Sequence, residues 1–506
     1  MSVRILSAAI IGLDAIPVEV EADNSPHGTP GMYIVGLADK AVDESKSRVR
    51  SAVKNSDLEF PRGNVTINLA PADLKKMGSY YDLPIAVACL LKTEQITLAD
   101  FRDNLFVGEL SLDGYLRPVS GVLSIADMCK RRGIKNIFLP PSNASEASLI
   151  DGLNVFGVEN LKQLASHLGG QELIPRYVPS ADYYFAPEVY DVDMAYVRGQ
   201  EQAKRALEIA AAGSHNILMS GPPGSGKTML AKAMVSILPK MSADESLEVT
   251  KIYSTAGLLS SDKPLITTRP YRSPHHTASG VALVGGGAWP RPGEISLAHR
   301  GVLFLDEFLE FPKNVLENLR QPLEDGIISV SRVSGTLRFP AKFMLVAAMN
   351  PCPCGFYSDP TKECICNLAQ VIKYQKRASG PLLDRIDLHV EVPRVSFSKL
   401  ESESDGESSQ IIRSRIQSAR NIQISRFKEE NIIDNSEMGS EQLKKYCSLD
   451  NSSRDILRQA TEKLHLSARS YYRIIKVART IADLAGQDNI LLEHVAEALQ
   501  YRPKVE

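Results

Sequence analysis

Two short stretches of this sequence carry residue types whose spacing suits phosphate chemistry. The first, GPPGSGKT, fits the pattern G-x-x-x-x-G-K-[ST], in which glycines turn consecutive backbone N–H groups toward one anion. Lys227 would reach the β- and γ-phosphates of a nucleotide, and the Thr228 hydroxyl would ligate Mg²⁺. We therefore expect an ATP-binding loop whose members are Gly221, Pro222, Pro223, Gly224, Ser225, Gly226, Lys227 and Thr228.

Two carboxylates follow the apolar run of the second stretch, GVLFLDEF. Ligands bind at the carboxyl ends of strands in a parallel sheet, so Asp306 is predicted to hold Mg²⁺ and Glu307 to polarise the attacking water. Asn350 ends another apolar run, and its amide would orient that water. The alternative for Asn350 is a turn residue before Pro351.

Cations further along the chain could stabilise the charge on a transferring phosphoryl group. Arg385 is a candidate arginine supplied to a neighbouring subunit, and the alternative is a structural pair with Asp384 or Asp387. Arg469 and Arg473 fall on one helical face, which is either a solvated stripe or a sensor of the γ-phosphate. Lys476 shares this face, and the apolar Ile474, Val477, Ala478 and Ile481 form another.

Four of the seven cysteines lie between residues 352 and 366, a distribution that favours a reducing compartment over a disulfide framework. Their two C-x-C pairs suit either a Cys₄ zinc site or a set of reduced thiols in a surface hairpin. The candidate ligands are Cys352, Cys354, Cys364 and Cys366. The adjacent His275 and His276 are further candidate ligands, but they would point to opposite sides of an extended segment, so a turn role is favoured for them.

The elements that must position these residues form three regions, as a chain of 506 residues requires about three domains. Residues 1–170 alternate strand patterns such as NVTINLA with helical patterns, and MSVRILSAAIIG is expected to be folded rather than a signal peptide. The strand NILMS, the glycine loop and the helix TMLAKAMVSIL follow one another in the second region. Residues 411–500 read as almost wholly helical.

Bulk properties narrow the class of protein further. No apolar run approaches the roughly 18 residues that span a bilayer, so we expect a cytoplasmic protein without a membrane partner. The net charge of −2 gives no sign of nucleic-acid binding, so any contact with DNA requires a local basic surface.

Together these stretches resemble the AAA+ ATPases, and more narrowly the magnesium-chelatase-like ComM/YifB family. The resemblance covers nearly the whole chain. It rests on IVGLADKAVDESKSRVRSAVKNS, INLAPADLKKMGSYYDLPIA, YRSPHHTASGVALVGGG, RPGEISLAHRGVLFLDE, LRQPLEDG, AAMNPCPCG and SGPLLDRIDLHVEVP.

The resemblance implies an α/β fold in three parts. Residues 1–170 would form a Lon-protease-like (ribosomal S5 domain 2-like) α/β domain, 193–396 an AAA+ core with a parallel sheet, and 411–506 a helical lid of the magnesium-chelatase C-terminal type. Residues 171–192 and 397–410 would be linkers. Asn350 would be sensor 1, Arg385 the arginine finger, and Arg469 sensor 2, with Arg473 as its rival.

The family also implies a homo-hexamer that uses ATP and Mg²⁺ to drive DNA branch migration, a helicase activity used in competence for transformation and in recombination. Candidates for a DNA-binding pore are the predicted hairpin around Arg332 and Arg338 and the glycine-rich VGGGAWPRPG, and the alternative for both is a structural insertion. Trp289 could stack on single-stranded DNA or pack against the ring. A chelatase-like or protein-remodelling ATPase without DNA activity is the alternative function.

The Lon likeness also raises the alternative of a protease. The catalytic serine position falls at Tyr80, one residue from Ser79, and the lysine position falls at Leu123. Because no lysine is there to activate a hydroxyl, we expect a non-proteolytic domain.

Overall fold

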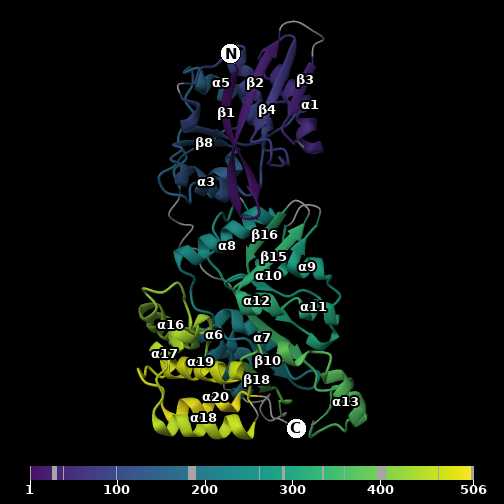
Figure 1. The fold of residues 1–506 in the computed structure, drawn as a ribbon, viewed down its shortest axis with the longest axis vertical. Coiled ribbons are helices and arrows are strands. Elements are labelled where there is room, and N and C mark those ends of the chain that lie inside the picture. The colour runs from purple at the N-terminus through teal and green to yellow at the C-terminus, as the bar shows by residue number, and fades with distance from the viewer. Residues whose placement is uncertain are drawn as a thin grey trace. The chain divides into compact units, whose positions relative to one another are not determined.

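The computed structural model describes residues 2–25, 31–37, 39–98, 100–179, 190–260, 262–287, 291–332, 335–357, 359–395, 406–464 and 466–502. The chain divides into two compact units, which are described separately (Figure 1). The N-terminal unit comprises Met1–Ala186 and Ser246–Ile266, and the C-terminal unit comprises Pro187–Glu245 and Thr267–Glu506. Among the described helices, none combines the length and apolar character needed to cross a membrane.

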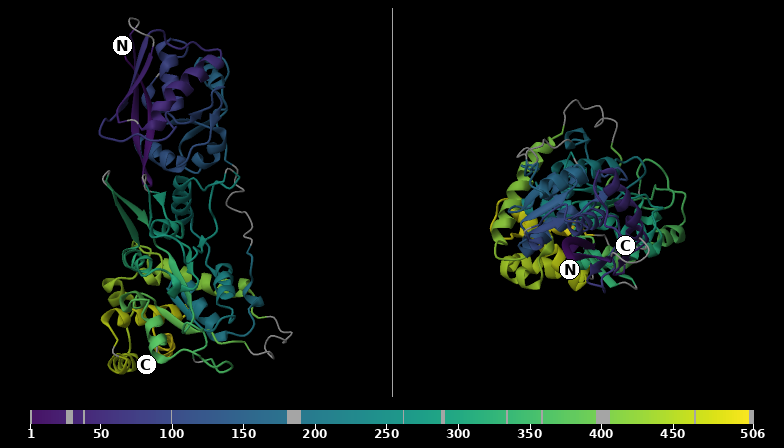
Figure 2. Two further views of the ribbon diagram at one scale, coloured as in Figure 1. Left: turned by 90° about the vertical axis from the view of Figure 1, so that its right-hand side faces the viewer. Right: turned by 90° about the horizontal axis from the view of Figure 1, so that it is seen from above.

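A seven-stranded mixed sheet organises the N-terminal unit, in the order β3-β4-β2-β1-β5-β8-β9. Its long strands β1 and β2 pair antiparallel along their length (Figure 2, left). Residues at the start of the chain thus form a paired strand, as expected for a folded segment. The strands are β1 (Val3–Ile11), β2 (Asp14–Ser25), β3 (Gly31–Val35), β4 (Asn64–Ala70), β5 (Asn104–Phe106), β8 (Asn136–Leu139) and β9 (Asn154–Gly157).

Helices cover both faces of this sheet. Alternate side chains of a strand point to opposite faces, and here they enter two different hydrophobic clusters. In β1, Ile5 and Ala9 join one cluster, whereas Leu6 and Ala8 join the other. The first cluster is closed by α1 (Lys40–Asn55), α2 (Asp82–Lys92) and α5 (Leu161–Leu168), and the second by α3 (Val122–Arg132) and α4 (Pro141–Ala147). The short strands β6 (Glu109–Leu110) and β7 (Leu116–Arg117) form a separate ribbon.

Residues 246–266, which the sequence places in the ATPase core, belong to the N-terminal unit instead. They include most of helix α8 (Ala243–Ala256). The Ser254 hydroxyl donates to the buried carboxylate of Glu146, and Lys251 lies 3.0 Å from Asp127. These specific contacts lie far from residue 250 in sequence, which is why local patterns did not predict this boundary.

A five-stranded parallel sheet organises the C-terminal unit, in the order β11-β14-β17-β10-β18. Its strands are β10 (Ile217–Ser220), β11 (Tyr271–Arg272), β14 (Val302–Leu305), β17 (Met344–Met349) and β18 (Leu388–Glu391). The predicted strands of the ATPase core coincide with β10, β14 and β17. The helices that follow along the chain are α6 (Glu201–Gly213), α7 (Lys227–Ile237), α9 (Gly280–Val284), α10 (Glu294–Leu297), α11 (Lys313–Glu317), α12 (Arg320–Asp325), α13 (Leu368–Gln375) and α14 (Gly380–Leu383).

The C-terminal helices gather on one side of this unit and share its hydrophobic core (Figure 1). Ile416 of α16 and Ile474 of α19 enter the same cluster as Ile217 and Val346 of the sheet. This shared core explains why the structure has two compact units where three domains were expected. The helices are α16 (Ser409–Arg426), α17 (Ser440–Tyr446), α18 (Asn451–Lys463), α19 (Ala468–Leu484) and α20 (Leu492–Gln500).

The predicted hairpin is confirmed: β15 (Ile327–Arg332) pairs antiparallel with β16 (Gly335–Pro340). Arg338 is exposed on it. The side chain of Arg332 and the whole of Trp289 lie outside the described residues, as do residues 180–189 of the first predicted linker and 397–405 of the second. A further ribbon pairs β12 (Gly285–Gly286) with β13 (Arg291–Pro292).

Candidate nucleotide site

The glycine loop connects β10 to the first turn of α7, with Gly226 as the helix N-cap. Gly224 and Gly226 have φ angles of +76° and +92°, which side chains with a Cβ rarely adopt. At Gly221, an added Cβ would lie 2.1 Å from the Val392 carbonyl oxygen. The loop therefore needs glycine for both backbone direction and close packing, and it presents backbone N–H groups beside the positive end of α7.

Lys227 is buried and folds back onto the loop that carries it. Its Nζ donates to the carbonyl oxygens of Gly221 at 2.7 Å and Pro222 at 2.9 Å. Burial lowers the pKa of the Lys227 ammonium to about 8, although nearby Asp306 acts to raise it. A polyanion at the loop would restore the missing countercharge, so the lysine is suited to a phosphate.

The predicted magnesium ligands already lie in contact. Asp306 follows the buried strand β14, and its Oδ2 accepts a hydrogen bond from the Thr228 hydroxyl at 2.7 Å. Hydroxyl and carboxylate oxygens at one edge of a parallel sheet suit a small divalent cation beside bound phosphates.

Glu307 is exposed and adopts φ +51°, a left-handed conformation that is uncommon for residues other than glycine. Its carboxylate lies 3.1 Å from His276 Nδ1. His276 thus contacts the predicted catalytic carboxylate, a role that sequence reasoning missed when it assigned the histidine to a turn. The neighbouring His275 contacts Thr277 instead, with Nδ1 2.9 Å from the Thr277 Oγ1.

Asn350 directly follows β17, which pairs with β10. Its Oδ1 lies 3.4 Å from Lys227 Nζ. The structure therefore brings Lys227, Thr228, Asp306 and Asn350 to one edge of the sheet, and Glu307 follows Asp306 directly.

A cavity of about 450 Å³ adjoins the phosphate loop. Its lining joins loop residues to the segment before α6 and to the segment after β18. The lining residues are Tyr196, Val197, Arg198, Gln200, Pro223, Gly224, Ser225, Gly226, Met229, Leu230, Arg394 and Val395. Its size and mixed lining suit a nucleoside. Sequence reasoning missed residues 196–200 and 394–395, because no local pattern links them to the loop.

Arg385 and Arg469 lie away from this edge. Arg385 precedes β18, and the backbone N–H of nearby Asp387 donates to the carbonyl oxygen of Asn216, which precedes β10. Arg385 therefore lies at the amino edge of the sheet. Arg469 lies beside it, because Arg385 and Arg469 both donate to Glu324. Arg385 is 5% exposed, whereas the side chain of Arg469 is 55% exposed.

An ion pair with the buried carboxylate of Asp387 holds Arg473 at the same amino edge. Arg473 donates to Asp387 and, at 2.8 Å, to the carbonyl oxygen of Arg385. Burial acts to raise the pKa of Asp387, but Arg473 and His215 outweigh it and hold this pKa well below its usual range. The predicted apolar face of α19 is confirmed, because Ile474, Val477, Ala478 and Ile481 are all buried.

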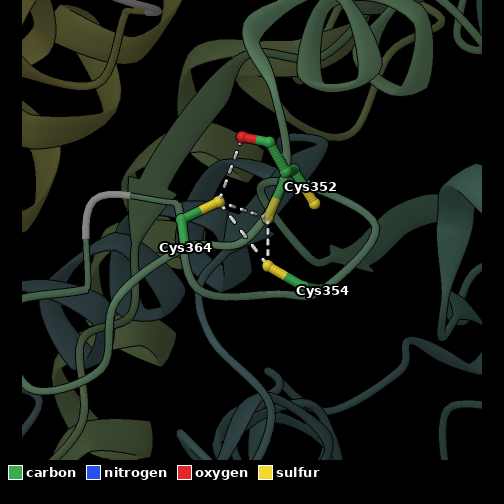
Figure 3. A group of neighbouring side chains, drawn as sticks. Cys352, Cys354 and Cys364 are labelled. Atoms are coloured by element: carbon green, nitrogen blue, oxygen red, sulfur yellow. Dashed lines mark hydrogen bonds between the residues drawn. The ribbon is translucent and has the colours of Figure 1, made fainter.

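The four clustered cysteines bring their sulfur atoms within 4.8 Å of one another. The Sγ atom of Cys352 lies 3.3 Å from that of Cys354 and 3.7 Å from that of Cys364, and the latter two are 3.5 Å apart (Figure 3). Tetrahedral ligands about 2.3 Å from zinc have sulfur atoms at similar separations. The tight C-x-C spacing therefore does not prevent a closed set of four ligands.

The chemistry of these thiols also suits a cation. Burial acts to raise the pKa of the Cys354 thiol, but the backbone N–H groups of Phe356 and Ile365 help to lower it to about 6. The N–H of Cys366 acts to lower the pKa of Cys364, yet burial and the neighbouring thiols raise it to about 12. Four thiolates thus resist ionising together unless a metal ion neutralises them.

Comparisons with known proteins match the chain along most of its length. The family model described as "Subunit ChlI of Mg-chelatase" matches residues 18–143, "Magnesium chelatase, subunit ChlI" matches 193–400, and its C-terminal model matches 406–502. Competence protein ComM of Haemophilus influenzae is 42% identical over 512 residues, which is 100% of this chain and 98% of that protein.

Two further relatives show how the similarity is distributed. The uncharacterised protein YifB of Escherichia coli is 43% identical over 504 residues, covering 99% of this chain and 97% of its own. The magnesium-chelatase 38 kDa subunit of Rhodobacter capsulatus is 29% identical over 169 residues, covering 30% of this chain and 48% of its own.

Proposed function

We propose that this chain, which belongs to the magnesium-chelatase-like ComM/YifB family of AAA+ ATPases, is an ATP-driven DNA motor that promotes branch migration. Family membership implies ATPase activity with ATP and Mg²⁺. The DNA substrate is the further step, and the name of the competence protein that matches the chain along its length supports it. This role would place the chain in the cytoplasm, where its seven thiols would stay reduced.

The residues at the carboxyl edge of the sheet would have different roles in ATP hydrolysis. Lys227 and the loop N–H groups would hold the β- and γ-phosphates, while Glu307 and Asn350 would orient the water that attacks the γ-phosphorus. The bond from that phosphorus to the β–γ bridging oxygen breaks, and ADP and phosphate result. Mg²⁺, held by Thr228 and Asp306, would neutralise charge on the phosphates.

The single observation that carries the proposed assembly is the division of the site between two edges of one sheet. The phosphate-binding residues lie at the carboxyl edge, whereas Arg385 and Arg469 lie at the amino edge. From that edge, an arginine would act on the nucleotide of another chain rather than on that of its own. A closed ring, which we take to be a hexamer, would bring the amino edge of one subunit to the nucleotide of the next.

The N-terminal unit is proposed to be a Lon-like platform without protease activity. Leu123, at the expected position of the catalytic lysine, is buried, and its backbone N–H donates to Glu146 at 2.8 Å. Ser79 is engaged by Glu109. DNA would be contacted by loops such as the β15–β16 hairpin, on which Arg338 is exposed.

We further propose zinc as the ion for Cys352, Cys354, Cys364 and Cys366. Closed tetrahedral sets of four thiolates are typical of structural zinc sites.

A second function remains in competition because the matching family models describe a magnesium-chelatase subunit. In that case the ATPase would act on a protein or metal-insertion partner, and DNA would not affect its turnover.

Turnover with and without DNA separates the two functions. ATP hydrolysis would be measured without DNA, with single-stranded DNA and with a synthetic four-way junction. Separation of the junction into duplexes would be followed on a gel. A DNA motor is expected to hydrolyse ATP about tenfold faster with DNA and to separate the junction into duplexes by branch migration. Lys227→Ala should be inactive in both assays. Unchanged turnover and an intact junction would favour the chelatase-like function.

A further inference from the structure

The cysteine-rich loop, residues 352–366, begins immediately after the predicted sensor Asn350 and Pro351. Cys352 is fully buried, and its Sγ accepts a hydrogen bond from the Tyr357 N–H at 3.3 Å. The Pro351 carbonyl oxygen accepts a hydrogen bond from the Gln375 side chain of α13 at 3.1 Å. A metal ion bound at Cys352 would therefore fix the chain two residues from Asn350.

The same loop packs directly against the phosphate loop. Gly355 has φ +84°, and a Cβ added to it would lie 2.5 Å from Cδ and 2.7 Å from Cγ of Pro223. Gly355 sits between Cys354 and Phe356, so its position depends on how the cysteines are held. Pro223 in turn lines the nucleoside cavity.

Phe356 extends this contact to the far wall of the cavity. The Arg394 guanidinium lies over the Phe356 ring at 5.2 Å, and the Lys362 ammonium lies over the same ring at 4.1 Å. Arg394 lines the cavity together with Pro223. Asp359, also in the cysteine-rich loop, lies 3.3 Å from Arg394. Loop residues thus hold a cation that borders the space for the nucleotide.

We infer that the four-cysteine loop is a metal-held wall of the nucleotide site, so that zinc occupancy sets the affinity for nucleotide. This inference rests on the ATPase function proposed above. A loop of about this size gains its fixed shape from the metal rather than from a core of its own. Without zinc, the contacts to Pro223, Arg394 and the Asn350 segment would have to be ordered by the nucleotide, at a cost in affinity.

Metal content and nucleotide affinity are measured separately on the full chain. The zinc content per chain is measured by elemental mass spectrometry. The Kd of a fluorescent ADP analogue is measured for the protein as purified, for the protein stripped of zinc with a chelator, and for the stripped protein after zinc is restored. We expect one zinc per chain, an affinity about tenfold weaker without it, and recovery when zinc is returned.

Variants distinguish the binding of zinc from the effect of the cysteine-rich loop on the nucleotide site. Cys354→Ala combined with Cys364→Ala should lose zinc and bind the analogue about tenfold more weakly, as the stripped protein does. Phe356→Ala should keep zinc and a wild-type circular dichroism spectrum yet still bind the analogue more weakly, because it removes the ring that Arg394 and Lys362 contact but leaves all four cysteines. Cys129→Ala, a cysteine substitution in the N-terminal unit, is the matched control and should change neither quantity.

Absence of zinc from the purified protein overturns the inference. An equal affinity with and without zinc, or a Phe356→Ala variant that binds like the wild type, overturns it while the ATPase function stands. If the zinc-loaded wild type binds no nucleotide, the proposed ATPase function itself fails.

Discussion

At the scale of the residue, Lys227 shows how the phosphate loop is stabilised before a ligand arrives. Its ammonium donates to two carbonyl oxygens of its own loop, which keeps a buried cation hydrogen-bonded. The cost of this arrangement is the pKa of about 8, because burial disfavours the charged form. Phosphates would replace the carbonyls and restore the charge.

This lowered pKa predicts that nucleotide affinity depends on pH. Below pH 8 the free Lys227 is charged and binding takes up no proton there. Above pH 8 the free lysine loses its proton, whereas a phosphate-bound lysine keeps it, so binding must take up a proton and weakens. We expect the Kd for ADP to rise by up to about tenfold per pH unit above pH 8.

Fluorescence titrations between pH 7 and 9.5 measure this effect, with thermal unfolding at each pH as the control for a folded protein. A constant Kd across this range would show that the lysine remains charged in the free protein.

At the scale of the element, helix α19 is joined to the sheet by a buried ion pair. Asp387, directly before β18, is 5% exposed, and Arg473 comes from the second turn of α19. Arg469, one turn earlier, reaches Glu324 from an exposed position. The two candidate sensor arginines therefore have different structural duties, and stability measurements can separate them.

Arg473→Ala would leave the Asp387 carboxylate buried without its main cation. We expect a loss of about 3–5 kcal/mol in the free energy of unfolding of the C-terminal unit, measured by guanidinium denaturation. Arg469→Ala removes an exposed pair and should cost less than about 1 kcal/mol. The same Arg469→Ala variant should bind nucleotide yet hydrolyse it poorly if Arg469 is sensor 2. Equal losses of stability would contradict this assignment of duties.

At the scale of the whole molecule, the proposed function requires two chains to complete each hydrolytic site. The carboxyl edge would bind the phosphates, whereas the amino edge carries Arg385 and Arg469. Arg385 is held by Glu324 in the single chain, so a neighbour must compete for it. Turnover should therefore depend on assembly.

Mixing two inactive variants checks this dependence directly. Lys227→Ala and Arg385→Ala should each lack hydrolysis, because one loses phosphate binding and the other loses the arginine donated to the neighbour. Rings assembled from an equal mixture should recover about a quarter of the wild-type rate, since a heterologous interface joins the intact lysine to the intact arginine at that frequency. A mixture as inactive as its parts would show that sites are not shared. The two proteins incubated under conditions that prevent assembly provide the control.

Local sequence determined the phosphate loop and most of the elements around it. The glycine spacing, the carboxylates after an apolar strand and the 3.6-residue period of α19 are set by neighbours in the chain, so they can be recognised without a fold. Four cysteines within a short stretch likewise indicated a metal site.

Tertiary structure alone decided which of these residues meet. It joined His276 to Glu307, placed Arg394 and Tyr196 around one cavity, set Arg385 and Arg469 on Glu324 away from the phosphate loop, and assigned residues 246–266 to the N-terminal unit. These contacts join residues that are far apart in sequence. Their positions follow from strand order and core packing, which depend on the whole chain folding together and leave no periodic trace in any single segment.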